Sequence, residues 1–390
     1  MSDFKPTLDQ ERAMESVMDW WKLQKSGYLT LGGFAGTGKT TLMSELREKI
    51  NNENNKTRIS FCAYTGKASQ VLKNTLVKKI GGKNLDNVST IHSLIYSPII
   101  NDSKKVIGWT KKESIEADLI VVDEASMINR KIWEDLKSFR IPILAVGDHG
   151  QLPPVGESFN LMEKPMLKLE KIHRQAEDNP IIKLSMMARN EGKIPVGRYG
   201  NNIRKLSRYE SETGYEIEEV LQGNNDDLLI LAGYNKTRVN LNKAIRNYKG
   251  YESDKPEVGD KVICLKNNWQ KNIFNGMSGR IASIFPIMEK LWEPEFYEVE
   301  IEMENGMIYD GRIKADQFGN MTNDNRDVSV KECDFFDFGY ALTVHKAQGS
   351  QAKKVLLFEE RFPKMSDDEW RRWLYTGITR AEKELIIVGY

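Results

Sequence analysis

Residues 28–40 of the chain read YLTLGGFAGTGKT, the stretch most informative about its architecture. The apolar residues at its start predict a short buried strand, the glycines predict a turn, and residues 40–50 follow with a helical pattern. Residues 33–40 match G-x-x-x-x-G-K-[ST] between that strand and that helix, which is the context that this phosphate-binding pattern requires. Glycines allow the backbone N–H groups to face an anion, and the helix N-terminus adds a favourable dipole.

The side chains of this loop and of a second strand suit hydrolysis of a nucleoside triphosphate. Lys39 would reach the β- and γ-phosphates, and the Thr40 hydroxyl would bind Mg²⁺. Residues 119–124 read LIVVDE, an apolar strand that ends in two carboxylates. We expect Asp123 to hold the metal shell and Glu124 to polarise the attacking water, with a helix cap or a surface ion pair as the structural alternative. These features predict an NTPase but do not separate kinases, switches and motors.

Apolar strands alternate with helices in two parts of the chain, which predicts parallel sheets covered on both faces. In the first part the predicted strands are 28–34, 58–64, 118–125 and 141–148, with helices at 40–50 and 67–79. In the second part the strands are 228–235, 354–360 and 384–390, with helices at 236–248 and 367–375. The predicted fold class is therefore α/β with two such domains.

A stretch with a different pattern interrupts the second part. Residues 297–304 read YEVEIEME and alternate apolar with acidic side chains, and the hairpin signal Asn305-Gly306 follows them. We therefore predict a small β-barrel inserted into the second α/β domain. The predicted domains are residues 1–172, residues 173–255 together with 336–390, and the barrel at 256–335.

The net charge is +1 over 390 residues, so any attraction for a polyanion must be local. Two lysine-rich stretches, Lys73–Lys83 and Lys104–Lys112, are either such local patches or two solvated loops. The acidic face of the predicted barrel should point away from a bound polyanion, because carboxylates repel phosphates. That face carries Glu298, Glu300, Glu302 and Glu304.

The composition is that of a globular protein, with 40% hydrophobic and 29% charged residues. No apolar run reaches the roughly 18 residues that a membrane-spanning helix needs, and the N-terminal MSDFKPTLDQ lacks the apolar segment of a secretion signal. Cys62, Cys264 and Cys333 are far apart and have no zinc-ligand spacing, as in proteins of reducing compartments. We therefore expect a cytoplasmic protein without membrane contact.

Two arginines in later segments are suited to neutralise the charge that develops during phosphoryl transfer. Arg174 lies in LEKIHRQ (169–175), and Arg380 lies in LYTGITRAEKELIIVG (374–389). With these segments the chain resembles the RecD/Dda group of superfamily-one DNA helicases, from about Leu8 to Tyr390. The other matching segments, in the family's order, are GFAGTGKTT, VVDEASMI, LAVGDHGQLPPV (144–155) and LTVHKAQGSQ (342–351).

The resemblance implies two RecA-like domains that hold ATP and Mg²⁺ in the cleft between them. The catalytic residues that it implies are Lys39, Glu124, Gln151 as the sensor of the γ-phosphate, Arg174 and Arg380. It places the metal at Thr40 and Asp123, and it places the adenine beside Gln10 of LDQERAM. The implied nucleotide contacts are Gln10, Gly36, Thr37, Gly38, Lys39, Thr40, Thr41 and Gly349.

The resemblance also implies movement along single-stranded DNA, 5′ to 3′, with unwinding of forked or tailed duplexes in replication, recombination or repair. CAYTGKAS (62–69) and STIHSLI (89–95) resemble segments that hold the DNA backbone, where contacts carry no sequence information. The implied strand contacts are Thr65, His92, Thr343 and His345. We further expect a monomer, with single-strand-binding or replication proteins as partners.

Members of this group carry a hairpin in the first domain that splits the duplex. The candidate here is about 97–114, SPIINDSKKVIGWTKKES, which places Trp109 among lysines. Its indole either stacks on a DNA base at the fork or packs the hairpin against its own domain. Three other functions stay open: an ATP-dependent clamp that does not move, an RNA helicase and, against most of the motifs, a P-loop kinase.

Overall fold

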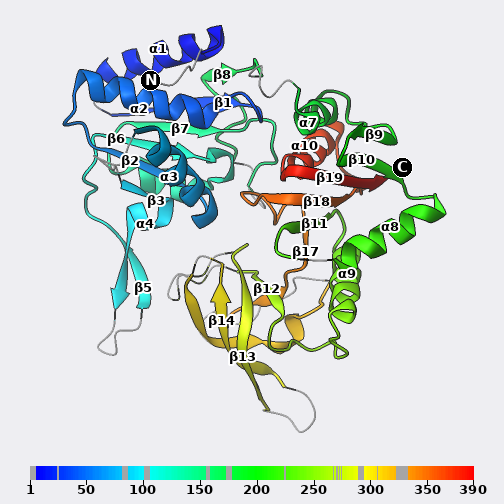
Figure 1. The fold of residues 1–390 in the computed structure, drawn as a ribbon. Coiled ribbons are helices and arrows are strands. Elements are labelled where there is room, and N and C mark those ends of the chain that lie inside the picture. The colour runs from blue at the N-terminus through cyan, green and yellow to red at the C-terminus, as the bar shows by residue number, and fades with distance from the viewer. Residues whose placement is uncertain are drawn as a thin grey trace.

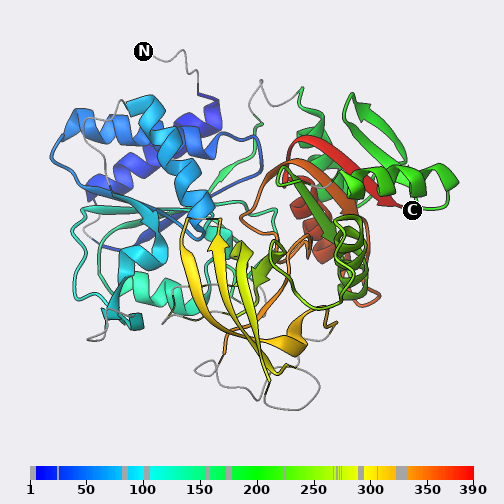
Figure 2. The same ribbon diagram turned by 60° about the horizontal axis from the view of Figure 1, so that its bottom comes forward.

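The chain folds into two α/β units and a smaller antiparallel barrel, as seen in a computed structural model (Figure 1). The blue and cyan N-terminal unit stands beside the second unit, and the yellow barrel lies below the second unit. Figure 2 brings the barrel forward, with the two units behind it on either side. The structure describes residues 6–23, 26–80, 87–100, 106–154, 159–172, 178–223, 225–266, 268, 271, 273, 275–288, 294–304, 306–321 and 333–390.

The first unit is built on a parallel sheet whose described strands run in the order β3-β2-β6-β7-β1-β8. These strands are β1 (Tyr28–Gly33), β2 (Ile59–Ala63), β3 (Asn87–Thr90), β6 (Leu119–Asp123), β7 (Ile143–Gly147) and β8 (Leu167–Leu169). The helices are α1 (Leu8–Leu23), α2 (Lys39–Glu53), α3 (Gly66–Ile80), α4 (Ile91–Ile95) and α5 (Arg130–Lys137). The central strands are buried almost throughout because α1 to α3 pack on one face and α4 and α5 on the other.

The second unit has a sheet in the order β17-β11-β18-β19-β10-β9 within the described residues. Its strands are β9 (Gly197–Gly200), β10 (Ile203–Ser207), β11 (Leu228–Ala232), β17 (Ala341–Thr343), β18 (Ala352–Phe358) and β19 (Ala381–Gly389). Its helices are α7 (Pro180–Glu191), α8 (Ser211–Gln222), α9 (Asn235–Tyr248) and α10 (Asp367–Ile378). All pairs are parallel except β9 with β10, an antiparallel edge that the sequence pattern did not predict. The predicted α/β fold class with two parallel-sheet domains is confirmed.

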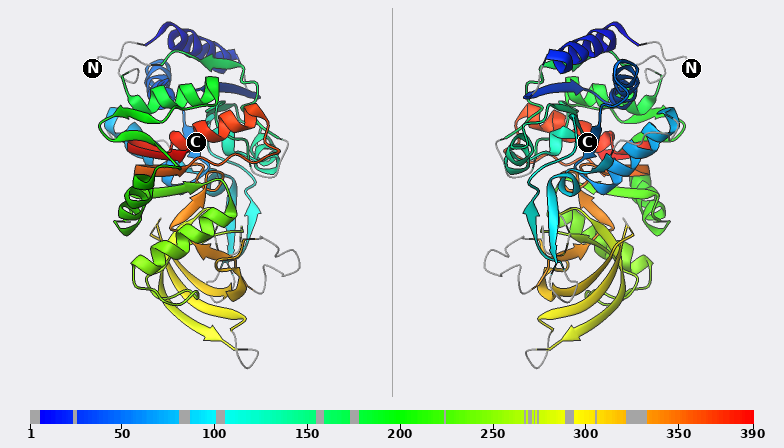
Figure 3. Two further views of the ribbon diagram at one scale, coloured as in Figure 1. Left: turned by 90° about the vertical axis from the view of Figure 1, so that its right-hand side faces the viewer. Right: turned by 90° about the vertical axis from the view of Figure 1, so that its left-hand side faces the viewer.

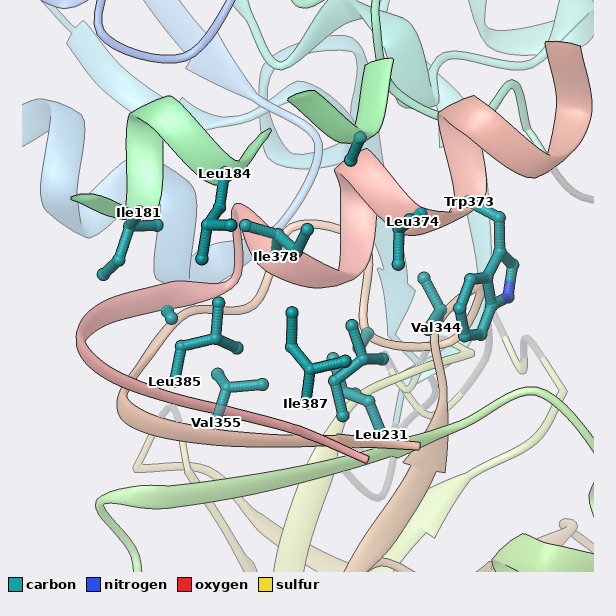
Figure 4. Packing of buried hydrophobic residues seen from close by; sticks show 14 of the residues in the cluster. Ile181, Leu184, Leu231, Val344, Val355, Trp373, Leu374, Ile378, Leu385 and Ile387 are labelled. Carbon is teal, nitrogen blue, oxygen red and sulfur yellow. The ribbon is translucent and has the colours of Figure 1, made fainter. Parts of the chain in front are cut away.

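Helix α10 is fixed firmly to its own sheet. A capping box starts it: the Ser366 hydroxyl accepts the Glu369 N–H while the Glu369 carboxylate accepts the Ser366 N–H. Leu374 and Ile378 pack over β18 and β19, and Figure 4 shows them between α7 and that sheet. Trp373 is fully buried in the same core. The remaining side of α10 faces the first unit, so that any residue there is held by a rigid support.

The barrel consists of antiparallel strands in the order β15-β14-β13-β12-β16. They are β12 (Lys261–Cys264), β13 (Ser278–Ile287), β14 (Phe296–Met303), β15 (Ile308–Lys314) and β16 (Phe336–Phe338). Strand β14 alternates buried apolar residues with exposed glutamates, as the pattern at 297–304 predicted. Gly306 adopts a φ of 82° in the turn that follows, and Asn305 lies outside the described residues.

A buried carboxylate closes the barrel. Asp334 forms a parallel bridge with Ile313 of β15, just before β16 begins. Its carboxylate, 1% exposed, accepts hydrogen bonds from Asn268 Nδ2 at 2.6 Å, Lys271 Nζ at 2.7 Å and Tyr309 Oη at 2.7 Å. Several donors are needed because a buried charge is costly unless it is paired and hydrogen-bonded. This network joins the two edges of the five-stranded sheet.

A two-stranded hairpin projects from the first unit. It consists of β4 (Tyr96–Ile100) and β5 (Val106–Lys111), with Pro98 opposite Trp109. These strands lie in the stretch at about 97–114 where a hairpin is expected, and residues 101–105 between them are outside the described residues. The hairpin and the barrel extend to the same side of the molecule (Figures 1 and 3).

The described residues contain no helix with the length and apolar character required to cross a bilayer. Cys62, Cys264 and Cys333 are free thiols in buried positions. Burial raises the pKa of Cys264 to about 12, so that this thiol stays protonated and unreactive at neutral pH. The three cysteines therefore contribute to the hydrophobic cores.

Candidate functional site

The loop between β1 and α2 has the backbone shape of a phosphate cradle. Gly36 has a φ of 80° and Gly38 a φ of 77°, left-handed conformations that glycine adopts without a steric penalty. Gly38 is also the N-cap of α2 and offers no side chain to the first-turn N–H groups. Those groups and the helix dipole make this point of the fold suited to an anion.

Lys39, the first residue of α2, folds back over the loop. Its Nζ donates to the carbonyl oxygens of Gly33 at 2.8 Å and Phe34 at 3.0 Å, and it lies 4.0 Å from Asp148 Oδ2. To reach phosphate oxygens, the ammonium group exchanges the two carbonyls for stronger, charged acceptors. The Thr37 hydroxyl donates to the Phe34 carbonyl at 2.8 Å and thus braces the loop from within.

The side chain of Gln10, on α1, contacts the phosphate-binding loop. Its side chain is fully buried, with Nε2 donating to the Thr37 carbonyl at 2.8 Å and Oε1 accepting from the Thr7 N–H at 2.9 Å. A Cβ on Gly38 would lie only 2.6 Å from Gln10 Nε2, so this contact also requires a glycine there. The Gln10 amide thus joins the phosphate loop, through Thr37, to the residue before α1, through Thr7, and its contact with adenine stays a prediction.

Two carboxylates stand at the carboxyl end of β6, beside the phosphate loop. The Glu124 N–H donates to Asp123 Oδ1 at 2.9 Å, and Glu124 adopts a φ of 52°, a strained value for a residue with a Cβ. Burial and the neighbouring Glu124 carboxylate raise the pKa of Asp123 to about 7, while Lys39 opposes the shift. A divalent cation at this point would relieve the repulsion between the two carboxylates.

Four buried polar atoms near these carboxylates have no hydrogen-bond partner among the described residues. They are Glu124 Oε2, Ser126 Oγ, His149 Nδ1 and Gln151 Oε1. Buried polar atoms are nearly always paired in folded proteins, so a group of unpaired ones needs an explanation. They follow β6 and β7, neighbouring parallel strands whose carboxyl ends open beside the loop that follows β1. The residues thus fit a bound triphosphate with Mg²⁺, to which Thr40 and Asp123 are the expected metal ligands.

Arg174 and Arg380 are the two arginines that we expect the second domain to direct toward the phosphates. Arg174 lies outside the described residues. Arg380 is 2% exposed, and its guanidinium donates to Thr376 O at 3.0 Å, Ser350 O at 3.3 Å and Thr379 Oγ1 at 3.2 Å. All three acceptors belong to the second unit, so the structure does not place Arg380 on the phosphate loop.

Helix α10 instead presents other side chains to the loop after β7, residues 148–152. Arg372 Nη1 donates to His149 O at 2.6 Å, and Thr376 Oγ1 accepts the Leu152 N–H at 3.0 Å. Outside α10, Gln348 Nε2 donates to Leu152 O at 2.7 Å. These three residues were not predicted from the sequence. Gln348 and Thr376 lie within the matched segments 342–351 and 374–389, and Arg372 lies just before the second, so their positions could have indicated them. The segment that carries Gln151 is therefore held by the second unit.

Gly349 marks another contact between the units. It has a φ of 74°, and a Cβ added there would lie 3.0 Å from both Met127 Sδ and Thr65 Cγ2. Gly349, which we expect to contact the nucleotide, thus lies in the loop after β17 at the point where that loop contacts the first unit. Thr65 Oγ1 accepts the Ala68 N–H at 3.2 Å, which caps the start of α3.

His92 lies inside the first unit rather than on its surface. Its ring lies 5.8 Å from that of Tyr96, nearly parallel to it, and 6.3 Å from that of Tyr64. Burial lowers the pKa of His92 to about 4, so the imidazole is neutral near pH 7 and cannot form an ion pair with phosphate. His92 thus packs beside Tyr64 and Tyr96, and its expected contact with DNA stays a prediction.

The other expected strand contacts lie on two separate elements. Thr343 is the last residue of β17 and His345 lies two residues later, where burial lowers the pKa of His345. Trp109 lies half-buried on β5, and its Nε1 has no hydrogen-bond partner among the described residues.

Family models match most of the chain. The family described as AAA domain matches residues 7–209, more than half of the chain, and the UvrD-like helicase C-terminal domain matches residues 338–388. The chain is 27% identical to the ATP-dependent RecD2 DNA helicase of Deinococcus radiodurans, over 98% of this chain and 49% of that protein. It is 24% identical to the ATP-dependent DNA helicase dda of Enterobacteria phage T4, over 98% of this chain and 99% of that protein.

Other similarities agree in fold. The chain is similar to the crystal structure of Pif1 helicase from Bacteroides in complex with ADP-AlF3 and ssDNA, with a TM-score of 0.50 and 16% identity. That match covers 99% of this chain and 92% of the other. Among the curated relatives, the chain spans about half of the Deinococcus protein and 38% of an uncharacterised protein of Methanocaldococcus jannaschii.

Proposed function

Since the chain belongs to the AAA-domain family and to the RecD/Dda group of superfamily-one helicases, we propose that it is an ATP-dependent DNA helicase. It would translocate along single-stranded DNA, 5′ to 3′, and unwind forked or tailed duplexes. The observation that carries this proposal is the junction of the two units. Helix α10 of one unit holds the 148–152 loop of the other, beside the phosphate cradle, so that events at the cradle reach both units.

Each residue of the cradle has a proposed part in hydrolysis. Lys39 and the loop amides bind the triphosphate, and Thr40 with Asp123 holds Mg²⁺, which neutralises phosphate charge when bound. Glu124 accepts the proton of the attacking water, and Gln151 orients that water against the γ-phosphate. Arg174 and Arg380 would add positive charge from the second unit, which for Arg380 requires leaving its three present acceptors.

The DNA path is proposed to run across both units. Thr65 and His92 on the first unit and Thr343 with His345 on the second would contact the backbone of the strand. We propose residues 1–172 as the first domain, residues 173–255 with 336–390 as the second, and 256–335 as the inserted barrel, supported by the membership of the three sheets. A cytoplasmic monomer that meets single-strand-binding or replication proteins completes the proposal.

Two measurements test the function. ATP turnover should rise when single-stranded DNA is added, and rise less with RNA of the same sequence. A strand carrying a protein block at one end should lose the block only when that block stands at the 3′ end. ATP turnover without directional displacement would favour the alternative of a stationary clamp, and stimulation by RNA alone would favour an RNA helicase.

Trp109 is expected to serve unwinding rather than movement. Trp109→Ala should lower the rate of duplex unwinding by about tenfold or more, because base–indole stacking contributes about 1–3 kcal/mol. Block displacement from single strands should stay within twofold of wild type. Tyr215→Ala, an exposed aromatic on α8 of the second unit, is the control. Equal loss of both activities would assign Trp109 to packing of the hairpin instead.

A further inference from the structure

The hydroxyl of Tyr375 on α10 joins the two units directly at the phosphate loop. Its oxygen accepts the backbone N–H of Ala35 at 2.7 Å, and its O–H donates to Asp148 Oδ2 at 2.6 Å. Tyr375 is fully buried and Asp148 is 2% exposed, so both bonds lie away from water. Burial and the Asp148 carboxylate raise the pKa of Tyr375 well above its ordinary value, so the phenol remains a donor.

Ala35 lies inside the phosphate-binding pattern, whose backbone N–H groups cradle phosphates. An amide hydrogen that is bonded to the phenol at 2.7 Å cannot bind a phosphate oxygen at full strength at the same time. Lys39 Nζ lies 4.0 Å from the same Asp148 oxygen that accepts the phenol. One loop amide and the phosphate-binding lysine are thus both linked to the pair formed by Asp148 and Tyr375.

We propose that the Tyr375 hydroxyl is a positioning group that competes with the triphosphate for the Ala35 N–H and thereby links nucleotide binding to the position of α10. The inference rests on the proposed function, because it concerns the same cradle. When a phosphate oxygen accepts the Ala35 N–H, the Tyr375 hydroxyl keeps its bond to Asp148. Helix α10 then loses its direct hydrogen bond to the phosphate-binding loop. The helix stays attached to the 148–152 loop through Arg372 and Thr376.

The ring of Tyr375 has a separate, structural part. Its centroid lies 6.0 Å from that of Phe34, and a Cβ on Gly150 would lie 3.1 Å from its Cε1. Tyr375→Phe keeps this packing and removes only the hydroxyl, so the variant isolates the proposed competition. The fold should survive, since the ring fills the same buried space.

Two matched variants separate the competition from other effects. Thr376→Val removes the bond from the Leu152 N–H to Thr376 Oγ1, which loosens the junction without freeing a loop amide. Tyr234→Phe removes a hydroxyl that donates to Arg361 O at 2.7 Å, remote from the junction. Neither variant should bind nucleotide more tightly than wild type.

The experiment measures the dissociation constant of ATPγS by calorimetry for wild type and the three variants, with thermal unfolding as a check of the fold. Tyr375→Phe should bind about two- to tenfold more tightly, the range expected when one competing hydrogen bond is removed. The KM for ATP should fall with it while kcat does not rise, a split that a general loss of packing would not produce.

The outcomes are distinct. Unchanged or weaker binding by Tyr375→Phe, beside normal binding by wild type, overturns this inference and leaves the proposed function standing. Tighter binding by Thr376→Val to the same degree also overturns it, since loosening of the junction would then explain the gain. Failure of wild type to bind ATPγS contradicts the proposed function as well.

Discussion

Replacement of Lys39 by alanine is expected to lower DNA-stimulated ATP turnover by about 10²- to 10³-fold. Lys39 Nζ donates to the loop carbonyls of Gly33 and Phe34, from where it can move onto the phosphates. Alanine removes the positive charge that would stabilise the transferring phosphoryl group. A phosphate-release assay with saturating single-stranded DNA measures the change.

Binding should fall along with turnover in this variant. Calorimetry with ATPγS should give a weaker dissociation constant for Lys39→Ala, because the lysine contacts the ground state too. Lys243→Ala provides the matched control: that lysine is exposed on α9 and forms an ion pair with Asp254. Turnover by Lys39→Ala within a few-fold of wild type would remove the loop from the catalytic site.

Glu124→Gln should lower ATP turnover by about 10²- to 10⁴-fold, as much as Lys39→Ala or more, because it removes the general base rather than a phosphate contact. The amide keeps the size of the carboxylate and loses its ability to take a proton from water. Loss of the negative charge also removes a neighbour that raises the pKa of Asp123, so the metal ligand should ionise more readily. Phosphate release measured beside ATPγS binding separates the two steps.

Nucleotide binding by Glu124→Gln should stay equal to that of wild type or improve, because one repulsive charge near the phosphates has gone. Glu134→Gln on α5 is the control, since that carboxylate is exposed and pairs with Lys137. Near-normal hydrolysis by Glu124→Gln would assign the base to another residue. Loss of both binding and hydrolysis would give Glu124 a structural role at its strained turn.

The parts of the fold predicted from the sequence are those with a strong local pattern. The buried strands β1, β2, β6 and β7 are largely apolar because helices cover both faces of their sheet, and their bounds agree with the prediction to within two residues. Strands β3 and β9 were not predicted. Asn87–Thr90 is polar and Gly197–Gly200 contains two glycines, so neither carries a strand pattern, and each forms by pairing with an established neighbour.

For the site, sequence patterns located the segments better than the role of each side chain. The carboxylates of β6 and the loop at 33–40 lie at the same edge of the sheet, since β6 and β1 are parallel and flank β7. Gln10 and His92 have polar side chains suited to ligands, yet tertiary packing buries both. Tyr375 gave no separate signal, because only the approach of α10 to a loop 340 residues away in sequence makes its hydroxyl a partner of Ala35.

The position of β19 has a consequence for synthesis of the protein. That strand, Ala381–Gly389, lies between β18 and β10 in the interior of its sheet, whereas the first sheet is complete once β8 has been made. On the ribosome, the first unit can therefore fold during translation, while the second waits with two unpaired strand edges until its last strand emerges. Nascent chains stalled before residue 381 should expose those edges and be the species most prone to aggregate or engage chaperones.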